Sequence, residues 1–151
     1  MTGIDFFRAI GLRGLLLVVG LASMPGIASH TPESTPDPLP SGVAISINSE
    51  HLIELYQSTP NLKIIDARHY EDHTLGHIER SLSLPVTKMK CDDLAALTEG
   101  PDAPIVFYCN GGGGSSTRAI SIASNCGYRR LFWLEGGFIE WKHKDYPYVV
   151  D

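Results

Sequence analysis

The chain has 151 residues, of which 43% are hydrophobic and 19% are charged, and its formal net charge is -5. This length and composition fit one soluble domain with a hydrophobic core. The weak acidity and the lack of a basic cluster in the sequence argue against nucleic acid as a partner.

Residues 1–28 have the layout of a secretory signal peptide. Two arginines precede an uncharged apolar run at 15–28, and Gly26 and Ala28 provide a cleavage site of the small-x-small kind. The run is short for a membrane span, which needs about 20 residues. We therefore expect removal of the leader, a periplasmic or secreted product, and no stable membrane insertion afterwards. An uncleaved anchor is the alternative.

A linker and then a folded domain follow the leader. Residues 29–42 contain four prolines and few apolar side chains, which is typical of an extended linker. Within 43–151, apolar runs and turn residues predict alternating elements. The predicted strands are 43–47, 62–66, 81–86, 104–108 and 130–134. The predicted helices are 48–57, 69–75, 91–99, 116–126 and 136–144, the first of them capped by Asn48 or Ser49.

This alternation predicts an α/β fold, with a central parallel five-stranded sheet and helices on both faces. Ligands of such sheets bind beyond the carboxyl ends of the strands. Cys109 follows the most apolar predicted strand, 104–108, and therefore lies at that edge.

The segment FYCNGGGGSST places this cysteine before four glycines and three hydroxyl residues. A nucleophilic thiolate is stabilised by converging backbone N–H groups and by a helix N-terminus. Glycine allows the backbone angles that such convergence requires. We expect Gly111–Gly114 to form a cradle around the sulfur or a bound anion, with Ser115, Ser116 and Thr117 as donors and helix caps. A flexible turn after a core strand is the alternative.

Three segments together resemble the rhodanese family. IIDARHYEDHTLGHIERSLSLPV resembles its signature of an aspartate, an arginine two residues later, a short helix and Gly-His-Ile before a small strand. VFYCNGGGGSSTRAISIA corresponds to its cysteine loop and helix, and GYRRLFWLEGGFIEWKHKDYPY to its closing strand, Gly-Gly turn and tryptophan helix. The resemblance covers nearly all of residues 43–151.

The resemblance implies a sulfurtransferase in which Cys109 takes a sulfane sulfur from thiosulfate or a similar donor. A thiophilic acceptor such as cyanide or a thiol then removes the sulfur from the persulfide. The partners are thus small molecules, and neither a cofactor nor a metal is expected. The oligomeric state stays open. The predicted substrate-binding residues are Asn110, Gly111, Gly112, Gly113, Gly114, Ser115 and Arg118.

The loop departs from the family at one position. Many single-domain members have an arginine at the fifth position after the cysteine, where this chain has Gly114, and Arg118 is a candidate substitute. A catalytically silent rhodanese-like binding module is therefore the alternative function. A phosphatase or arsenate reductase is disfavoured because the arginine that would clamp an oxyanion is replaced by Ser115.

The resemblance assigns Asp66 and Arg68 to structural support of the site. His69, His73 and His77 have a spacing that suits metal ligands on a helix, but the sequence offers no carboxylate or thiol at motif distance. We therefore expect His69 and His73 to be solvated.

Three cysteines in an exported protein allow one disulfide and one free thiol. A bond between Cys91 and Cys126 would leave Cys109 free. Cys126 lies on the apolar face of its predicted helix, where a buried free cysteine is common, so the sequence leaves this bond open.

Overall fold

The computed structural model describes residues 43–111 and 113–151. The predicted leader and linker, 1–28 and 29–42, lie outside the described residues. None of the helices in the described part combines the length and the apolar character that a membrane crossing requires.

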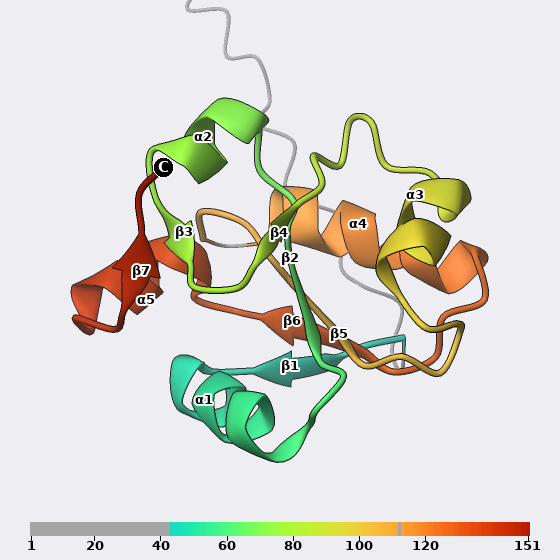
Figure 1. Cartoon of the computed structure of the whole chain (residues 1–151), viewed down its shortest axis with the longest axis horizontal. Helices are drawn as coiled ribbons and strands as arrows, with labels where there is room; N and C mark the ends of the chain where they lie inside the picture. Colours follow the sequence, from blue (N-terminus) through green and yellow to red (C-terminus); the bar gives the residue numbers. More distant parts are fainter. Residues whose placement is uncertain (1–42, 112) are drawn as a thin grey trace, which may run out of the picture. The chain divides into compact units, whose positions relative to one another are not determined.

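A parallel sheet of five strands forms the centre of the domain (Figure 1). Its strand order is β1-β6-β5-β2-β4. The bounds are β1 Ile45–Ile47, β2 Lys63–Asp66, β4 Leu82–Ser83, β5 Ile105–Tyr108 and β6 Leu131–Leu134. All four residues of β5 are buried, as expected for a strand with a parallel neighbour on each side. The predicted fold class is confirmed.

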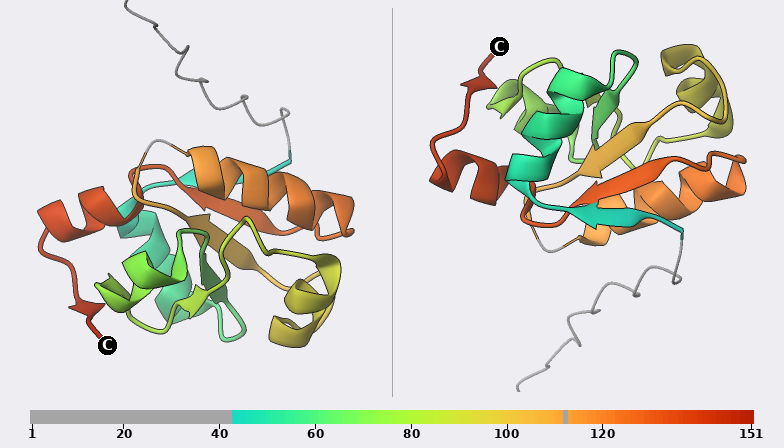
Figure 2. Two further views of the ribbon diagram at one scale, coloured as in Figure 1. Left: turned by 90° about the horizontal axis from the view of Figure 1, so that it is seen from above. Right: turned by 90° about the horizontal axis from the view of Figure 1, so that it is seen from below.

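Helices cover both faces of the sheet (Figure 2). The bounds are α1 Ser49–Ser58, α2 Tyr70–Thr74, α3 Cys91–Leu97, α4 Gly114–Asn125 and α5 Gly137–His143. Apolar residues of α3 and α4 form one core cluster with the sheet, and those of α1 and α5 form a second cluster. Asn48 caps α1 as predicted, since its side chain accepts a hydrogen bond from the N–H of His51 at 2.9 Å.

A second, two-stranded sheet was not apparent from the sequence. It pairs β3 (His77–Ile78) with β7 (Tyr148–Val149) in antiparallel register. Two-residue strands are too short to show a period of two, so no pattern distinguished them from loops. The predicted strand at 81–86 is likewise reduced to Leu82–Ser83.

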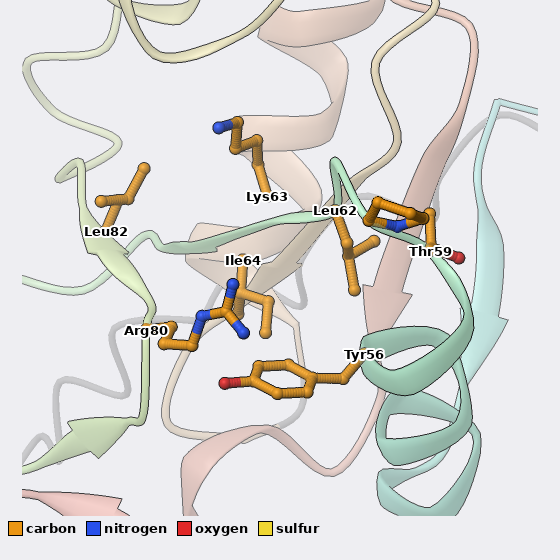
Figure 3. Close-up of a pocket in the computed structure, with 8 residues that line it drawn as sticks. Tyr56, Thr59, Leu62, Lys63, Ile64, Arg80 and Leu82 are labelled. Carbon is orange, nitrogen blue, oxygen red and sulfur yellow. The ribbon is translucent and has the colours of Figure 1, made fainter.

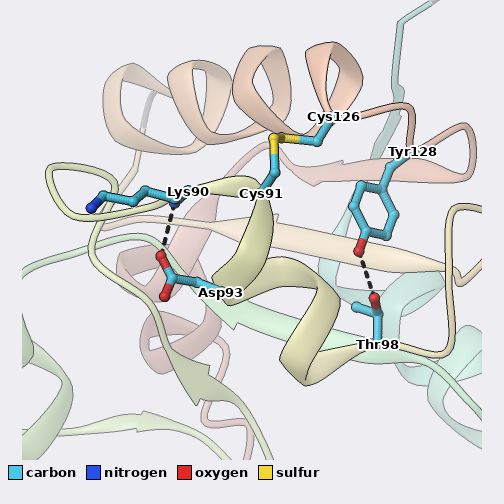
Figure 4. The surroundings of a disulfide bond; sticks show 6 residues. All are labelled: Lys90, Cys91, Asp93, Thr98, Cys126 and Tyr128. Atoms are coloured by element: carbon cyan, nitrogen blue, oxygen red, sulfur yellow. Dashed lines mark hydrogen bonds between the residues drawn. A yellow bond between two sulfur atoms is a disulfide. The ribbon is translucent and has the colours of Figure 1, made fainter.

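A disulfide joins α3 to the end of α4 (Figure 4). Cys91 opens α3 and Cys126 caps α4, and their Cα atoms are 5.4 Å apart. Beside the bond, the hydroxyls of Thr98 and Tyr128 lie 2.7 Å apart, which ties the end of α3 to the same region. The sequence left this bond open, and the structure decides it because α3 packs against α4 and brings the two cysteines together.

Candidate active site

Cys109 directly follows β5, at the carboxyl edge of the sheet, as predicted. The residue is 7% exposed, and its thiol is free. Two amides of α5 fix the backbone that follows, because Phe138 N donates to Cys109 O and Ile139 N donates to Asn110 O, each at 2.8 Å. The start of α5 therefore holds the first two peptide groups of the cysteine loop.

Gly137 makes this contact possible. Its φ is +55°, and a Cβ at this position would lie 2.4 Å from Cys109 O. Any other residue would combine backbone strain with a clash against the carbonyl that α5 has to approach. The second glycine of the Gly-Gly turn is thus required by close packing against the cysteine loop.

The loop amides face away from these contacts. A trans peptide directs its N–H opposite to its C=O, so the amides of Asn110 and Gly111 point away from α5. Among the residues that the structure describes, no atom accepts a hydrogen bond from the backbone N–H of Asn110, Gly111, Gly113, Gly114 or Ser115. The segment that follows Cys109 therefore retains a set of backbone donors without an acceptor among the described residues.

The side chain of Ser116 contacts the sulfur of Cys109. Its Oγ lies 3.4 Å from Cys109 Sγ and also donates to Gly113 O at 3.2 Å. A serine hydroxyl has one hydrogen, which can be directed at only one acceptor at a time. When the thiol loses its proton, the same hydroxyl can turn and donate to the sulfur.

The helix after the loop begins earlier than predicted. α4 starts at Gly114, so Ser115, Ser116 and Thr117 lie inside the helix, and the predicted capping by their hydroxyls was wrong. The N-cap is Gly113, whose φ of +100° and ψ of -13° favour glycine. A Cβ on Gly113 would lie 2.9 Å from Cζ2 of Trp133, so the indole forms a wall beside the loop.

The predicted cradle is therefore described only in part. Gly111 lies in the loop, Gly113 at the cap and Gly114 in the helix, while Gly112 lies outside the described residues. Arg118 is exposed on α4, and it forms no ion pair with any residue in the described part of the chain. Among the described residues, the side chain that contacts the Cys109 sulfur is Ser116; Asn110, Gly111, Gly113, Gly114 and Ser115 lie on the segment that follows Cys109.

A buried ion pair between Asp66 and Arg68 contacts the cysteine loop at Asn110. Arg68 donates through Nε to Asp66 Oδ1 at 2.9 Å, through Nη2 to Gly76 O at 2.8 Å, and through Nη1 to Asn110 Oδ1 at 3.3 Å. Burial acts to raise the pKa of Asp66, but the hydrogen bonds and charge of Arg68 outweigh it and hold this pKa below its usual value. The carboxylate thus stays charged and anchors the guanidinium against the residue that follows Cys109.

Tyr108 completes this network from β5. Its hydroxyl donates to Asp66 Oδ2 at 2.8 Å and lies 2.9 Å from Ser81 Oγ. Burial, followed by the negative charge of Asp66, raises the pKa of the phenol well above its ordinary value. Tyr108 is therefore a neutral donor to the carboxylate at neutral pH.

The structure corrects one expectation about the histidines. His69 is exposed as expected, but His73 is buried and its Nδ1 lies 3.1 Å from Asp66 Oδ2. The sequence alone gave no sign that the helix carrying His73 turns this side chain toward the end of β2.

One surface pocket lies away from the thiol, at the amino-terminal ends of β2 and β4 (Figure 3). It has a volume of about 250 Å³. The guanidinium of Arg80 lies over the ring of Tyr56, at 4.8 Å from its centroid, whereas Lys63 points away from both. Cys109 is not among the lining residues, so this pocket is separate from the candidate active site.

A family model described as the rhodanese-like domain matches residues 50–144, which include Asp66, Arg68 and the whole cysteine loop. The chain belongs to the rhodanese-like family. The predicted family membership is therefore confirmed, and sulfur-transfer or related chemistry is supported at the level of the family.

Curated relatives share only this domain. The tRNA uridine(34) hydroxylase of Cronobacter sakazakii is 28% identical over 88 residues, which are 56% of this chain and 25% of the relative. The corresponding protein of Citrobacter koseri has the same identity and coverage. The chain thus spans about a quarter of the length of these relatives.

Solved structures share the rhodanese-like fold. The BH2092 protein of Bacillus halodurans superposes with a TM-score of 0.63 at 20% identity, over 72% of this chain and 78% of that one. The rhodanese-like domain of the Anabaena protein Alr3790 gives a TM-score of 0.61 at 20% identity, covering 70% and 79%. A thiosulfate sulfurtransferase of Pseudomonas aeruginosa superposes with a TM-score of 0.58 at 22% identity, over 71% of this chain and 20% of that one.

Sequence reasoning missed three residues of this rhodanese-like site. Trp133 lies in the predicted strand 130–134, whose pattern does not show that its ring touches the loop at Gly113. The sequence places Gly137 only in the Gly-Gly turn, and Tyr108 only at the end of a strand. A tyrosine at the end of an otherwise nonpolar buried strand is a usable signal, since a buried hydroxyl needs a partner.

Proposed function

We propose that the protein is a rhodanese-type sulfurtransferase that works through a Cys109 persulfide. The supporting observation is the free thiol at the carboxyl edge of the sheet, followed in the chain by five backbone N–H groups, at 110, 111 and 113–115, that have no acceptor among the described residues. Such donors, together with the start of a 12-residue helix, favour negative charge on the sulfur before and after transfer.

The proposed reaction has two balanced steps. The Cys109 thiolate attacks the outer sulfur of thiosulfate, the S–S bond of the donor breaks, and sulfite leaves with the bonding electron pair. Cyanide or a thiolate then attacks the outer sulfur of the persulfide, and the Cys109 thiolate is restored. The free amides bind the charged sulfur in both states, and Ser116 can donate to it as well.

The proposed compartment is the periplasm or the exterior of the cell. The disulfide between Cys91 and Cys126 supports this proposal, because such bonds persist in oxidising compartments. The signal-peptide pattern of residues 1–28 also supports export. Small sulfur donors and acceptors are the proposed partners.

A catalytically silent binding module is the second candidate, favoured by the charge of the loop. Residues 109–117 contain no cation, and the guanidinium of Arg68 is paired with Asp66. An anionic donor would therefore be held by amides and hydroxyls alone.

One assay separates the two functions. The protein is incubated with thiosulfate and cyanide, and thiocyanate is measured for the parent and for Cys109→Ser. Mass spectrometry after thiosulfate alone should show a gain of about 32 Da, one sulfur, on Cys109. Equal thiocyanate rates for the two proteins would refute the sulfurtransferase, and binding of thiosulfate without sulfur transfer would support the silent module.

A further inference from the structure

A second cluster of functional side chains lies beside α2, outside the site of Cys109. His73, His77 and Asp151 each offer a ligand atom, and these atoms lie within 4.8 Å of one another. The pairing of β3 with β7 brings the chain around 149 to His77, and Asp151 N then donates to Thr74 O at 3.1 Å. The fold thus supplies the carboxylate that the histidine spacing lacks in the sequence.

The hydrogen bonds of the two imidazoles leave one nitrogen free on each. His73 Nδ1 faces Asp66 Oδ2 at 3.1 Å, and His77 Nδ1 faces His73 O at 3.0 Å. A carboxylate and a carbonyl can only accept, so each Nδ1 carries hydrogen and each neutral ring has its lone pair on Nε2. Neither Nε2 has a hydrogen-bond partner among residues 43–111 and 113–151.

This pattern is the one that supports histidines bound to metals. Such histidines donate their second N–H to a carboxylate or a backbone carbonyl, which fixes the tautomer and the orientation of the ring. Here Asp66 performs this role for His73, and the carbonyl of His73 performs it for His77. Both outer contacts are buried, so they favour the tautomer with the lone pair on Nε2 before any ion arrives.

The rings need one adjustment to share an ion. They stack with centroids 3.8 Å apart and planes 10° apart. Two nitrogens bound to one tetrahedral zinc ion lie about 3.4 Å apart, given Zn–N bonds of about 2.0–2.1 Å. The separation of the ring centroids is close to this value, so a small rotation of the rings can bring both Nε2 atoms to one ion. The carboxylate of Asp151 lies 3.9 Å from His77 Nδ1, and its side chain, which is 54% exposed, can turn toward Nε2 of that ring.

We propose that His73, His77 and Asp151 form a binding site for a zinc-type divalent ion, with water in the remaining position. Two imidazoles and one carboxylate suit zinc, cobalt or nickel better than magnesium or calcium, which prefer all-oxygen ligands. This inference does not depend on the proposed sulfurtransferase activity.

The test uses the full chain with Cys109→Ser, because a free thiol would itself bind zinc. Zinc is titrated in competition with a chromophoric chelator, and cobalt is titrated while its visible absorption is recorded. We expect one tight zinc ion per chain and cobalt bands of tetrahedral intensity. In the same background, Asp151→Asn and His77→Gln should each weaken zinc binding at least tenfold, since even outer partners of metal ligands change affinity by about 10–100-fold.

His69→Ala is the matched control, because this exposed histidine lies on the same segment and outside the cluster. It should bind zinc as the parent does. Asp151 is exposed, so its substitution tests the site without threatening the core. No tight zinc ion, or zinc affinity that is unchanged by Asp151→Asn, would overturn the proposal.

Discussion

Gly113 offers the sharpest test of how the cysteine loop is built, through its replacement by alanine. The residue is the N-cap of α4, with a φ of +100°, and the new Cβ would lie 2.9 Å from Trp133 Cζ2 and 3.2 Å from Thr117 Cγ2. The indole belongs to β6 and the threonine to α4, so neither can withdraw freely. The loop must therefore move away from its position over Cys109.

The expected loss of stability in Gly113→Ala has two parts. Backbone strain at this φ contributes about 1–3 kcal/mol, and forcing a methyl group into a packed contact contributes about 1–3 kcal/mol. We expect the free energy of unfolding to fall by about 2–6 kcal/mol. A shift of about 1 Å in catalytic groups lowers turnover by about 100-fold, so thiocyanate formation should fall by that order.

Gly114→Ala is the matched control, one residue further along the chain. A Cβ on Gly114 would meet no atom within 4 Å, and this residue begins the helix, where alanine is favoured over glycine by up to about 1 kcal/mol. Both variants are compared by urea unfolding and by the thiosulfate–cyanide assay. Equal turnover in Gly113→Ala and Gly114→Ala would refute the idea that the loop geometry at Gly113 is required.

Three further predictions concern the surroundings of the loop. Ser116→Ala should lower the thiocyanate rate about 10-fold or more, because a hydrogen bond to a charged group contributes about 1.5–3 kcal/mol; a parental rate would remove the hydroxyl from the mechanism. The pKa of Asp66 is lower in the folded chain than its ordinary 3.8, so the unfolded chain takes up this proton first on acidification. The contribution of Asp66 to stability is therefore complete above pH 3.8 and is lost as the pH falls through the folded-state pKa. In urea unfolding at several pH values, the free energy of unfolding should fall less steeply with acidification in Asp66→Asn than in the parent. Equal slopes for the two proteins would contradict this. The double variant Cys91→Ser/Cys126→Ser should lose about 3–4 kcal/mol of unfolding free energy, because the bond closes a loop of 35 residues. The parent protein unfolded in reductant should show the same loss. A double variant that unfolds at the same urea concentration as the oxidised parent would show that the bond adds no stability.

The sequence was a good guide to the order of the elements and to the position of Cys109 at the end of a strand. Buried strands such as Ile105–Tyr108 are continuous apolar runs, which a local window detects, and Cys109 follows directly from the end of that run. The elements that escaped prediction are β3 and β7, whose pairing joins His77 to Val149. A contact between segments so far apart in the chain leaves no local pattern in either of them.

The roles of single side chains depended still more on distant contacts. His73 looks like a solvated histidine on a polar helix, yet Asp66 accepts its hydrogen bond inside the protein. Cys126 looks like a buried free thiol, yet α3 brings Cys91 to within bonding distance. In each case the partner lies on another element, so the helical pattern around the residue was correct but could not reveal the partner.

The amino-acid sequence by itself determined the alternating fold, the family and the place of the candidate thiol, because these depend on local hydrophobic pattern and on short motifs. Only the tertiary structure decided what surrounds that thiol: the wall provided by Trp133, the amides of α5 that hold the loop backbone, and the Arg68 contact to Asn110. Those groups come from separate strands and helices, and they meet only when the sheet places its carboxyl ends along one edge.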